Sequence, residues 1–176
     1  MTSNYVTLKP LSHDDFIVVT QWNYDPKVTA FFSERTKPEI EHQQVWFNNQ
    51  INDTSKQKFI IICKQQKTKI GLVSLMKIDV INMNCEIGIT IGNTDFWGKN
   101  HGKDAMHLML KNCFENLKMH IVYLSVFETN IRGIKFFEKL GFNHDGMMRQ
   151  NVYKNNEFIS LNIMSITEIE FLNHQK

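Results

Sequence analysis

Residues 86–105 read EIGITIGNTDFWGKNHGKDA and contain the transition that decides the fold. An apolar strand-like segment ends in a loop that holds Gly98 and Gly102, and this loop continues directly into a helical pattern. The first N–H groups of a helix have no intrahelical acceptor and lie at the positive end of its dipole. The junction therefore predicts an anion-binding turn, and Lys99 and Lys103 add the positive charge that suits a diphosphate.

The same stretch also has a purely structural interpretation. A strand, a glycine-containing turn and a helix follow one another in any tight β-α connection. The stretch contains neither the G-x-x-x-x-G-K-[ST] phosphate loop nor the G-x-G-x-x-G dinucleotide fingerprint. On these residues alone, an anion site and an ordinary tight turn both remain open.

The rest of the chain shows strand and helix periodicities in a mixed order. We predict strands at residues 5–9, 58–63, 71–78, 85–91, 121–127, 147–154 and 158–166. We predict helices at residues 12–22, from residue 36 onward, at 101–118 and at 131–140, the last of them ended by Gly141. Only the middle of the chain alternates strand with helix, which excludes a doubly wound sheet. The chain is predicted to be one mixed α+β domain over residues 1–176.

Composition and charge exclude several classes of protein. The formal charge of +2 on 176 residues, without a clustered basic face, predicts no nucleic-acid partner. No apolar run approaches the length of about 18 residues that a membrane helix needs. Cys63, Cys85 and Cys113 form no C-x-x-C pair, so we expect buried reduced thiols in a cytoplasmic protein. Seven histidines without ligand spacing predict no metal site.

Two motifs in the second half of the chain resemble a known family. Residues 97–102 read WGKNHG and resemble the acyl-CoA loop of the GNAT superfamily, Gln/Arg-x-x-Gly-x-Gly/Ala. Trp97 replaces the Gln/Arg, as in the RimJ/RimL-like branch, and Asn100 replaces the first glycine. Asparagine is the residue other than glycine that best tolerates a positive φ, so the loop can keep its shape. Residues 130–142 read NIRGIKFFEKLGF and resemble the family signature Asn-x-x-Ala-x-x-Leu-Tyr-Glu-Lys-Leu-Gly-Phe.

The resemblance implies a fold, a reaction and a binding site. It implies a central, mostly antiparallel sheet flanked by helices, and direct transfer of an acetyl group from acetyl-CoA to an amine. It implies a donor site made of the main chain of one strand, the loop and the start of the helix after it, and the Asn motif. The residues implied for this site are Ile89, Thr90, Ile91, Trp97, Gly98, Lys99, Asn100, His101, Gly102, Lys103, Asn130 and Phe137. Asn130 is equally suited to cap the helix that follows it.

The chemistry needs a proton acceptor, because a lysine-like amine with a pKa near ~10.4 is almost entirely protonated at neutral pH. Glu86 is the candidate base, since branch members often carry a glutamate at this position. We expect an apolar setting among isoleucines to make it a better base. Its other interpretation is a solvated carboxylate at a strand edge, and His101 and His120 are alternative bases. Phe137 stands where the family commonly has a tyrosine that protonates the leaving thiolate, so Tyr153 or water would take that role.

The amine acceptor is the open part of the prediction. In this family it contacts the terminal hairpin and the region between the first two strands, here residues 22–53, where Glu34 and Glu41 could attract a cationic amine. Residues 46–51 are similar to bacterial spermidine acetyltransferases, but Arg35 and Lys37 interrupt the acidic cluster. A polyamine, a protein N-terminus, an amino sugar and an aminoglycoside-like compound all remain candidates. A CoA-binding module with little catalysis is the alternative from another class, and a homo-oligomer is one expected assembly.

Overall fold

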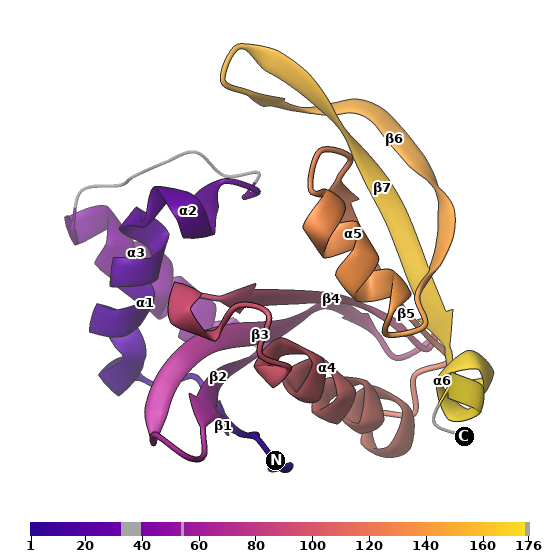
Figure 1. Ribbon diagram of the computed structural model, residues 1–176, viewed down its shortest axis with the longest axis horizontal. Coiled ribbons are helices and arrows are strands. Elements are labelled where there is room, and N and C mark those ends of the chain that lie inside the picture. The colour runs from indigo at the N-terminus through magenta and orange to yellow at the C-terminus, as the bar shows by residue number, and fades with distance from the viewer. Residues whose placement is uncertain (33–39, 54, 175–176) are drawn as a thin grey trace.

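The computed structural model describes residues 1–32, 40–53 and 55–174. Its framework is one seven-stranded sheet in the order β1-β2-β3-β4-β5-β7-β6 (Figure 1). The strands are β1 (Val6–Pro10), β2 (Gln57–Cys63), β3 (Thr68–Asp79), β4 (Asn84–Ile91), β5 (Ile121–Phe127), β6 (Asn143–Lys154) and β7 (Glu157–Thr167). Each of the seven predicted strands is present.

Neighbouring strands run antiparallel everywhere except between β4 and β5. The parallel pairing of β4 with β5 covers only residues 84–86 against residues 121–123. By contrast, β5 pairs with β7 along its whole length, residues 121–127. The prediction of a mixed fold around a mostly antiparallel sheet is confirmed.

The described residues contain six α-helices. They are α1 (Phe16–Tyr24), α2 (Pro26–Thr29), α3 (Ile40–Asn52), α4 (His101–Lys111), α5 (Ile131–Glu138) and α6 (Glu168–His174). A π-helical turn at Asn112–Asn116 extends α4, so the long predicted helix ends close to its expected limit. The sequence patterns did not predict α2 and α6, and the predicted start of α3 at residue 36 lies outside the described residues.

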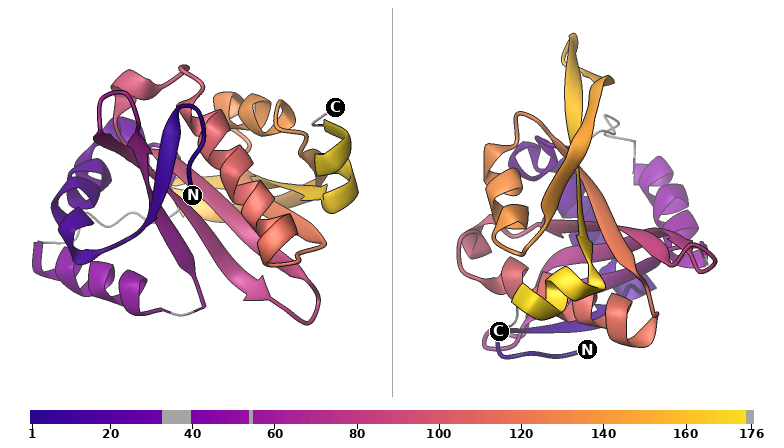
Figure 2. Two further views of the ribbon diagram at one scale, coloured as in Figure 1. Left: turned by 90° about the horizontal axis from the view of Figure 1, so that it is seen from below. Right: turned by 90° about the vertical axis from the view of Figure 1, so that its right-hand side faces the viewer.

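The helices cover both faces of the sheet, and β2 shows how the sequence directs them. Ile61 and Cys63 belong to the main core, which contains the apolar residues of α4, whereas Ile60 packs with α1 and α3 in a second cluster. Successive side chains of a strand point to opposite faces, so a continuous apolar run requires cover on both sides. Figure 2 shows α4 against one face and α1 with α3 against the other.

The cysteines lie inside this core as free thiols. Cys63, Cys85 and Cys113 are all buried, and the Sγ atoms of Cys85 and Cys113 are 3.9 Å apart. The prediction that the three cysteines are buried is confirmed. Within the described ranges, no helix has the length and apolarity to cross a membrane.

Candidate functional site

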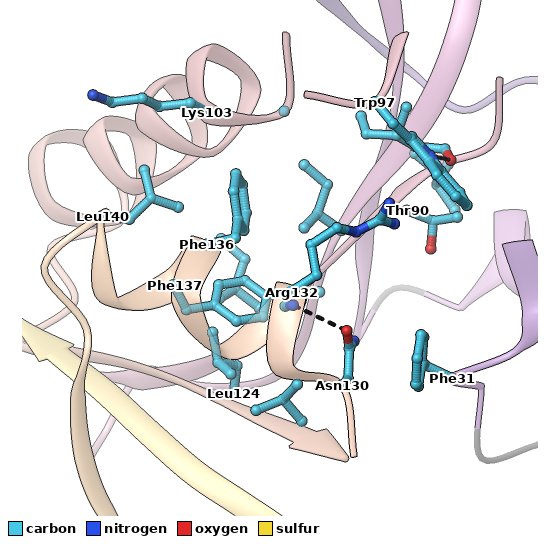
Figure 3. Close-up of a pocket in the computed structure, with 18 of the residues that line it drawn as sticks. Phe31, Thr90, Trp97, Lys103, Leu124, Asn130, Arg132, Phe136, Phe137 and Leu140 are labelled. Atoms are coloured by element: carbon cyan, nitrogen blue, oxygen red, sulfur yellow. Dashed lines mark hydrogen bonds between the residues drawn. The ribbon is translucent and has the colours of Figure 1, made fainter. Parts of the chain in front are cut away.

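A cleft of about 850 Å³ lies where β4 and β5 stop pairing, and both strands line it. Figure 3 shows Lys103 and Leu140 at one end of the cleft and Phe31 at the opposite end. We call the first the loop end, defined by residues 97–103 with the cations of α5. We call the second the aromatic end, defined by Val28, Phe31, Phe32, Phe127 and Leu161.

The turn at the loop end has the backbone shape that the sequence predicted. Gly98 has a φ of 75°, and Asn100, the N-cap of α4, has a φ of 61° and a ψ of −10°. The expectation that Asn100 adopts a positive φ is confirmed. Its side chain makes no capping hydrogen bond to the described first turn, so the N–H groups there are left for an outside acceptor. The start of α4 therefore presents an anion site to the cleft.

Trp97 joins this loop to the end of β4. Its indole Nε1 donates a 2.8 Å hydrogen bond to the carbonyl of Ile91, the last residue of the strand. The guanidinium carbon of Arg132, on α5, lies 4.0 Å from the centre of the indole ring, and Figure 3 shows the two side chains facing each other. Sequence reasoning missed Arg132, although it lies inside the second motif. The contact brings a cation of α5 beside the anion site.

The side chain of His101 points away from the cleft, so it does not reach the donor site that the sequence predicted for it. Its imidazole packs edge-to-face on Phe96 at 5.0 Å, and its Nε2 lies 3.6 Å from the Sγ of Cys63. His101 is not among the residues that line the cleft, whereas its neighbours Asn100 and Gly102 are. Only the main chain of His101 is therefore placed for the donor, and a role as base has no geometric support.

Asn130 caps α5, as one of its two interpretations predicted. Its Oδ1 accepts a 2.9 Å hydrogen bond from the N–H of Gly133, and it lines the cleft (Figure 3). A Cβ at position 133 would lie 2.5 Å from the Nδ2 of Asn130, so the glycine makes room for the cap. The cap uses Oδ1 and leaves the amide nitrogen beside the cleft, so capping and donor binding are compatible.

Phe137 lies on the wall of the cleft without a polar group to contribute. Its ring packs at 5.2 Å from Phe136 and at 5.8 Å from Phe142, and it is buried. Tyr153, suggested as a substitute acid, packs against Phe158 at 4.9 Å on the β6–β7 hairpin. It is not among the cleft-lining residues, so the geometry does not support this substitution.

Glu86 lines the cleft and is the last residue of β4 that pairs with β5. The surroundings of its carboxylate are polar, not apolar as we predicted. Its Oε2 lies 2.9 Å from the Nζ of Lys77, and its Oε1 accepts a 3.4 Å hydrogen bond from Ser125. The hydrogen bond and the charge of Glu86 raise the pKa of Lys77 above its ordinary value. Burial, followed by the charge of Glu86, raises the pKa of Tyr123, which is paired with Glu86 across the strands. Lys77 and Ser125 thus hold the carboxylate at the point where β4 and β5 separate.

Beyond Glu86, β4 pairs with another strand of the described residues on one side only. Residues 87–91 pair with β3, while the side toward β5 is open to the cleft. In an antiparallel pair, successive residues direct their hydrogen-bonding groups alternately to the two sides. Alternate residues of this segment therefore direct their N–H and C=O groups to the cleft, where a ligand that carries amides could pair with them; the carbonyl of Ile91 already accepts the hydrogen bond from Trp97.

The predicted donor residues come together with one exception. The ones that line the cleft are Ile89, Thr90, Ile91, Trp97, Gly98, Lys99, Asn100, Gly102, Lys103, Asn130 and Phe137; the exception is His101. Cations also gather around the cleft, at Lys27, Lys99, Lys103, Arg132, Lys135 and Lys139. An anion-binding turn, positive charge and an open strand edge together fit a donor with a phosphate-bearing head and an amide-containing arm.

The structure does not describe the acceptor side chains that the sequence suggested. Glu34 and the side chain of Glu41 lie outside the described residues. Sequence reasoning missed Phe31, Phe32 and Phe127, which form much of the aromatic end. No periodic pattern marks them, because they come from two segments that meet only in the folded chain.

Comparisons with known proteins identify the family of the chain. Residues 6–143 match the acetyltransferase (GNAT) domain family. The chain is 24% identical over 174 residues to a spermidine N(1)-acetyltransferase of Vibrio cholerae, and the match covers 99% of both chains. It is 25% identical over 175 residues to the spermidine N(1)-acetyltransferase of Escherichia coli K12, covering 99% of this chain and 92% of the relative.

A solved structure extends the likeness to the fold. The spermidine N-acetyltransferase of Vibrio cholerae, crystallised with CoA and spermine, superposes with a TM-score of 0.87 at 24% identity. The superposition covers 96% of this chain and 98% of that one. The chain therefore belongs to the GNAT acetyltransferase family and is an acetyl-CoA-dependent N-acetyltransferase.

Proposed function

We propose that this enzyme acetylates a primary amine of an aliphatic polyamine such as spermidine. The observation that carries the proposal is the full-length similarity to two spermidine N(1)-acetyltransferases, each matched over 99% of this chain. The aromatic end supports it, because exposed phenylalanine rings attract organic cations and pack against methylene chains. Phe31 is 42% exposed there, and its ring centre lies 6.5 Å from that of Phe127.

In this proposal, Glu86 accepts a proton from the substrate ammonium group, which leaves a neutral amine able to attack. Glu86 lines the cleft at the point where β4 and β5 separate, and we place the meeting of amine and thioester there. Lys77 and Ser125 hold the carboxylate in place through the contacts described above. The neutral amine nitrogen then forms the new bond to the acetyl carbon, the carbon–sulfur bond breaks, and the surplus proton of the nitrogen passes to the departing thiolate, directly or through water, so no acyl-enzyme forms.

The open main chain of β4 orients the donor and stabilises the charge that develops on the thioester oxygen. A fixed N–H group aimed at such an oxygen is one of the larger contributions to acyl transfer. The thiol leaving group has a pKa near ~8.5, so its departure at neutral pH depends little on a proton donor. This chemistry makes Phe137 compatible with turnover, as an apolar contact for the arm of acetyl-CoA.

A panel of amines tests the acceptor. We expect release of free thiol from acetyl-CoA to be fastest with spermidine or spermine, and slower with glucosamine, an aminoglycoside and a peptide with a free N-terminus. Mass spectrometry of the product identifies the acetylated nitrogen. Faster turnover of the sugar or the peptide would reject the polyamine proposal while leaving the acetyltransferase assignment intact.

Three finer predictions accompany this proposal. The tryptophan in the loop motif supports placement in the RimJ/RimL-like branch. We also propose a cytoplasmic location and a homo-oligomeric assembly. Light scattering of the purified protein tests the assembly, and a monomer across the working concentration range would reject it.

A further inference from the structure

Lys154 connects two segments that are far apart in the sequence. It is the last residue of β6, its exposed fraction is 9%, and its ammonium group lies among main-chain carbonyls of the segment that follows α2. The Nζ donates hydrogen bonds to the carbonyl oxygens of Thr29 at 2.9 Å, Ala30 at 2.8 Å and Phe32 at 2.8 Å. The ring of Phe127 lies 5.7 Å from the same nitrogen.

These contacts explain why a charged group is tolerated in a buried position. An ammonium ion removed from water must be hydrogen-bonded, and three carbonyl oxygens accept hydrogen bonds from it here. Carbonyl groups at the end of a helix have no intrahelical partner, and Lys154 donates to that of Ala30 and adds a second donor to that of Thr29, which also accepts from the N–H of Phe32. The result is a cross-link between the hairpin and residues 29–32.

The cross-linked segment carries part of the cleft wall. Phe31 and Phe32 line the cleft and belong to the segment that Lys154 holds. The ring of Phe31 also contacts Phe127, at the end of β5. In Figure 3, Phe31 lies across the pocket from Lys103 and Leu140. Holding residues 29–32 therefore fixes the aromatic end and leaves the donor side untouched.

We propose that Lys154 is a positioning residue for the amine acceptor. By holding residues 29–32 against the hairpin, it keeps the ring of Phe31 at the cleft, where the ring packs against the methylene chain of an aliphatic diamine or polyamine. This inference rests on the proposed function in one respect, that the acceptor enters at the aromatic end. Lys154 itself contacts neither substrate.

Substitution of Lys154 separates positioning from general stability. Lys154→Met keeps the length of the side chain and removes the charge, and we expect it to raise the KM for spermidine about tenfold and the KM for acetyl-CoA less than about twofold. Lys154→Arg keeps a buried cation with several donors and should restore most of the affinity. Lys111→Met is the matched control on the surface of α4, expected to change neither constant. Equal effects on both substrates, or none, would overturn the proposal.

A second variant tests whether Lys154 acts through Phe31. Phe31→Ala alone should raise the KM for spermidine, and adding Lys154→Met to it should then have less than about a twofold further effect. Multiplying effects in the double variant would show that Lys154 acts by another route, and would reject the positioning role.

Hydrogen exchange tests the cross-link without any substrate. We expect Lys154→Met to speed amide exchange in residues 26–32 and to leave residues 101–111 unchanged, since opening would be local. Unchanged exchange in residues 26–32 would reject the inference even in an active enzyme. If instead the wild-type protein turned over no amine of the panel, the proposed function would fail and this measurement would still decide whether the cross-link exists.

Discussion

The loop end and the aromatic end of the cleft are built in different ways. The loop end comes from one continuous stretch, residues 97–103, whose glycine and asparagine adopt positive φ values and expose N–H groups. The aromatic end is assembled from residues 28–32, the end of β5 and the β6–β7 hairpin, joined by Lys154. One end depends on the local path of the backbone, and the other on side chains that meet only after folding.

The difference separates what the two ends recognise. A donor that is common to many acetyltransferases can be bound by main-chain groups, which every residue carries. An acceptor that differs between enzymes needs side chains, which can change without disturbing the loop. Variants should therefore affect one substrate at a time, except at Glu86, which we propose acts where the amine meets the thioester.

The largest effect is expected from Glu86→Gln. Loss of a positioned base lowers kcat about 100-fold at neutral pH, with small changes in both KM values. The defect should shrink as pH rises toward the amine pKa near ~10.4, because more acceptor is then neutral without help. Lys77→Met, which keeps the carboxylate and removes its ion-pair partner, is the control and should reduce kcat far less. A pH–rate profile unchanged by Glu86→Gln would remove this residue from the mechanism.

Asn100→Val tests the loop end alone. A β-branched residue at a φ of 61° is strained by about 1–2 kcal/mol, so the KM for acetyl-CoA should rise about tenfold. Asn100→Gly accepts the same φ and should bind acetyl-CoA like the wild type. Steady-state kinetics with each substrate varied in turn measure both constants. An equal rise in the KM for the amine would contradict the separation of the two ends.

The effect of Gly133→Ala on the free energy of unfolding shows whether helix propensity or the Asn130 cap dominates at this position. Alanine normally stabilises a helix relative to glycine, but here its Cβ would displace the Asn130 cap, so we expect a loss of about 1 kcal/mol in the free energy of unfolding. In an Asn130→Ala background the obstruction is gone, and the same substitution should become stabilising. Denaturant unfolding measures both. A stabilising effect in the wild-type background would show that Asn130 is not a necessary cap.

The smallest effect is expected from Arg132→Gln. We expect about a threefold rise in the KM for acetyl-CoA at low salt, because an exposed cation beside the anion site is lost. The difference from the wild type should fade as ionic strength increases. Lys111→Gln, which removes an equal charge far from the cleft, is the control. A change confined to the KM for the amine would place Arg132 at the wrong end.

The parts of the site that follow from local chemistry could be predicted. Asn100 tolerates a positive φ because of its own side chain, and its place before a helix is visible in the sequence. The partners of Glu86 could not be predicted in this way. Lys77 reaches it from an irregularity in β3, where the pairing with β4 shifts between Met76 and Asp79 and Lys77 itself has a φ of 48°. No alternation of polar and apolar residues announces such a bulge.

The same limit applies to side-chain direction and to long-range contacts. His101 lies in a loop motif that predicted a role at the donor, yet its ring fills space against Phe96 and Cys63. Lys154 looks like an ordinary hairpin lysine in the sequence, and its buried position depends on carbonyl groups more than 120 residues away. Tertiary structure decides both cases.

The early end of pairing between β4 and β5 has a consequence for how this enzyme can evolve. A strand that offers its peptide groups to a ligand places little demand on the identity of its own side chains, provided that the sheet still packs. Residues 87–91 can therefore change as long as they stay extended and keep the apolar packing that Ile87 makes in the core. Divergence to 24–25% identity with the spermidine N(1)-acetyltransferases is compatible with unchanged main-chain binding of the acetyl donor.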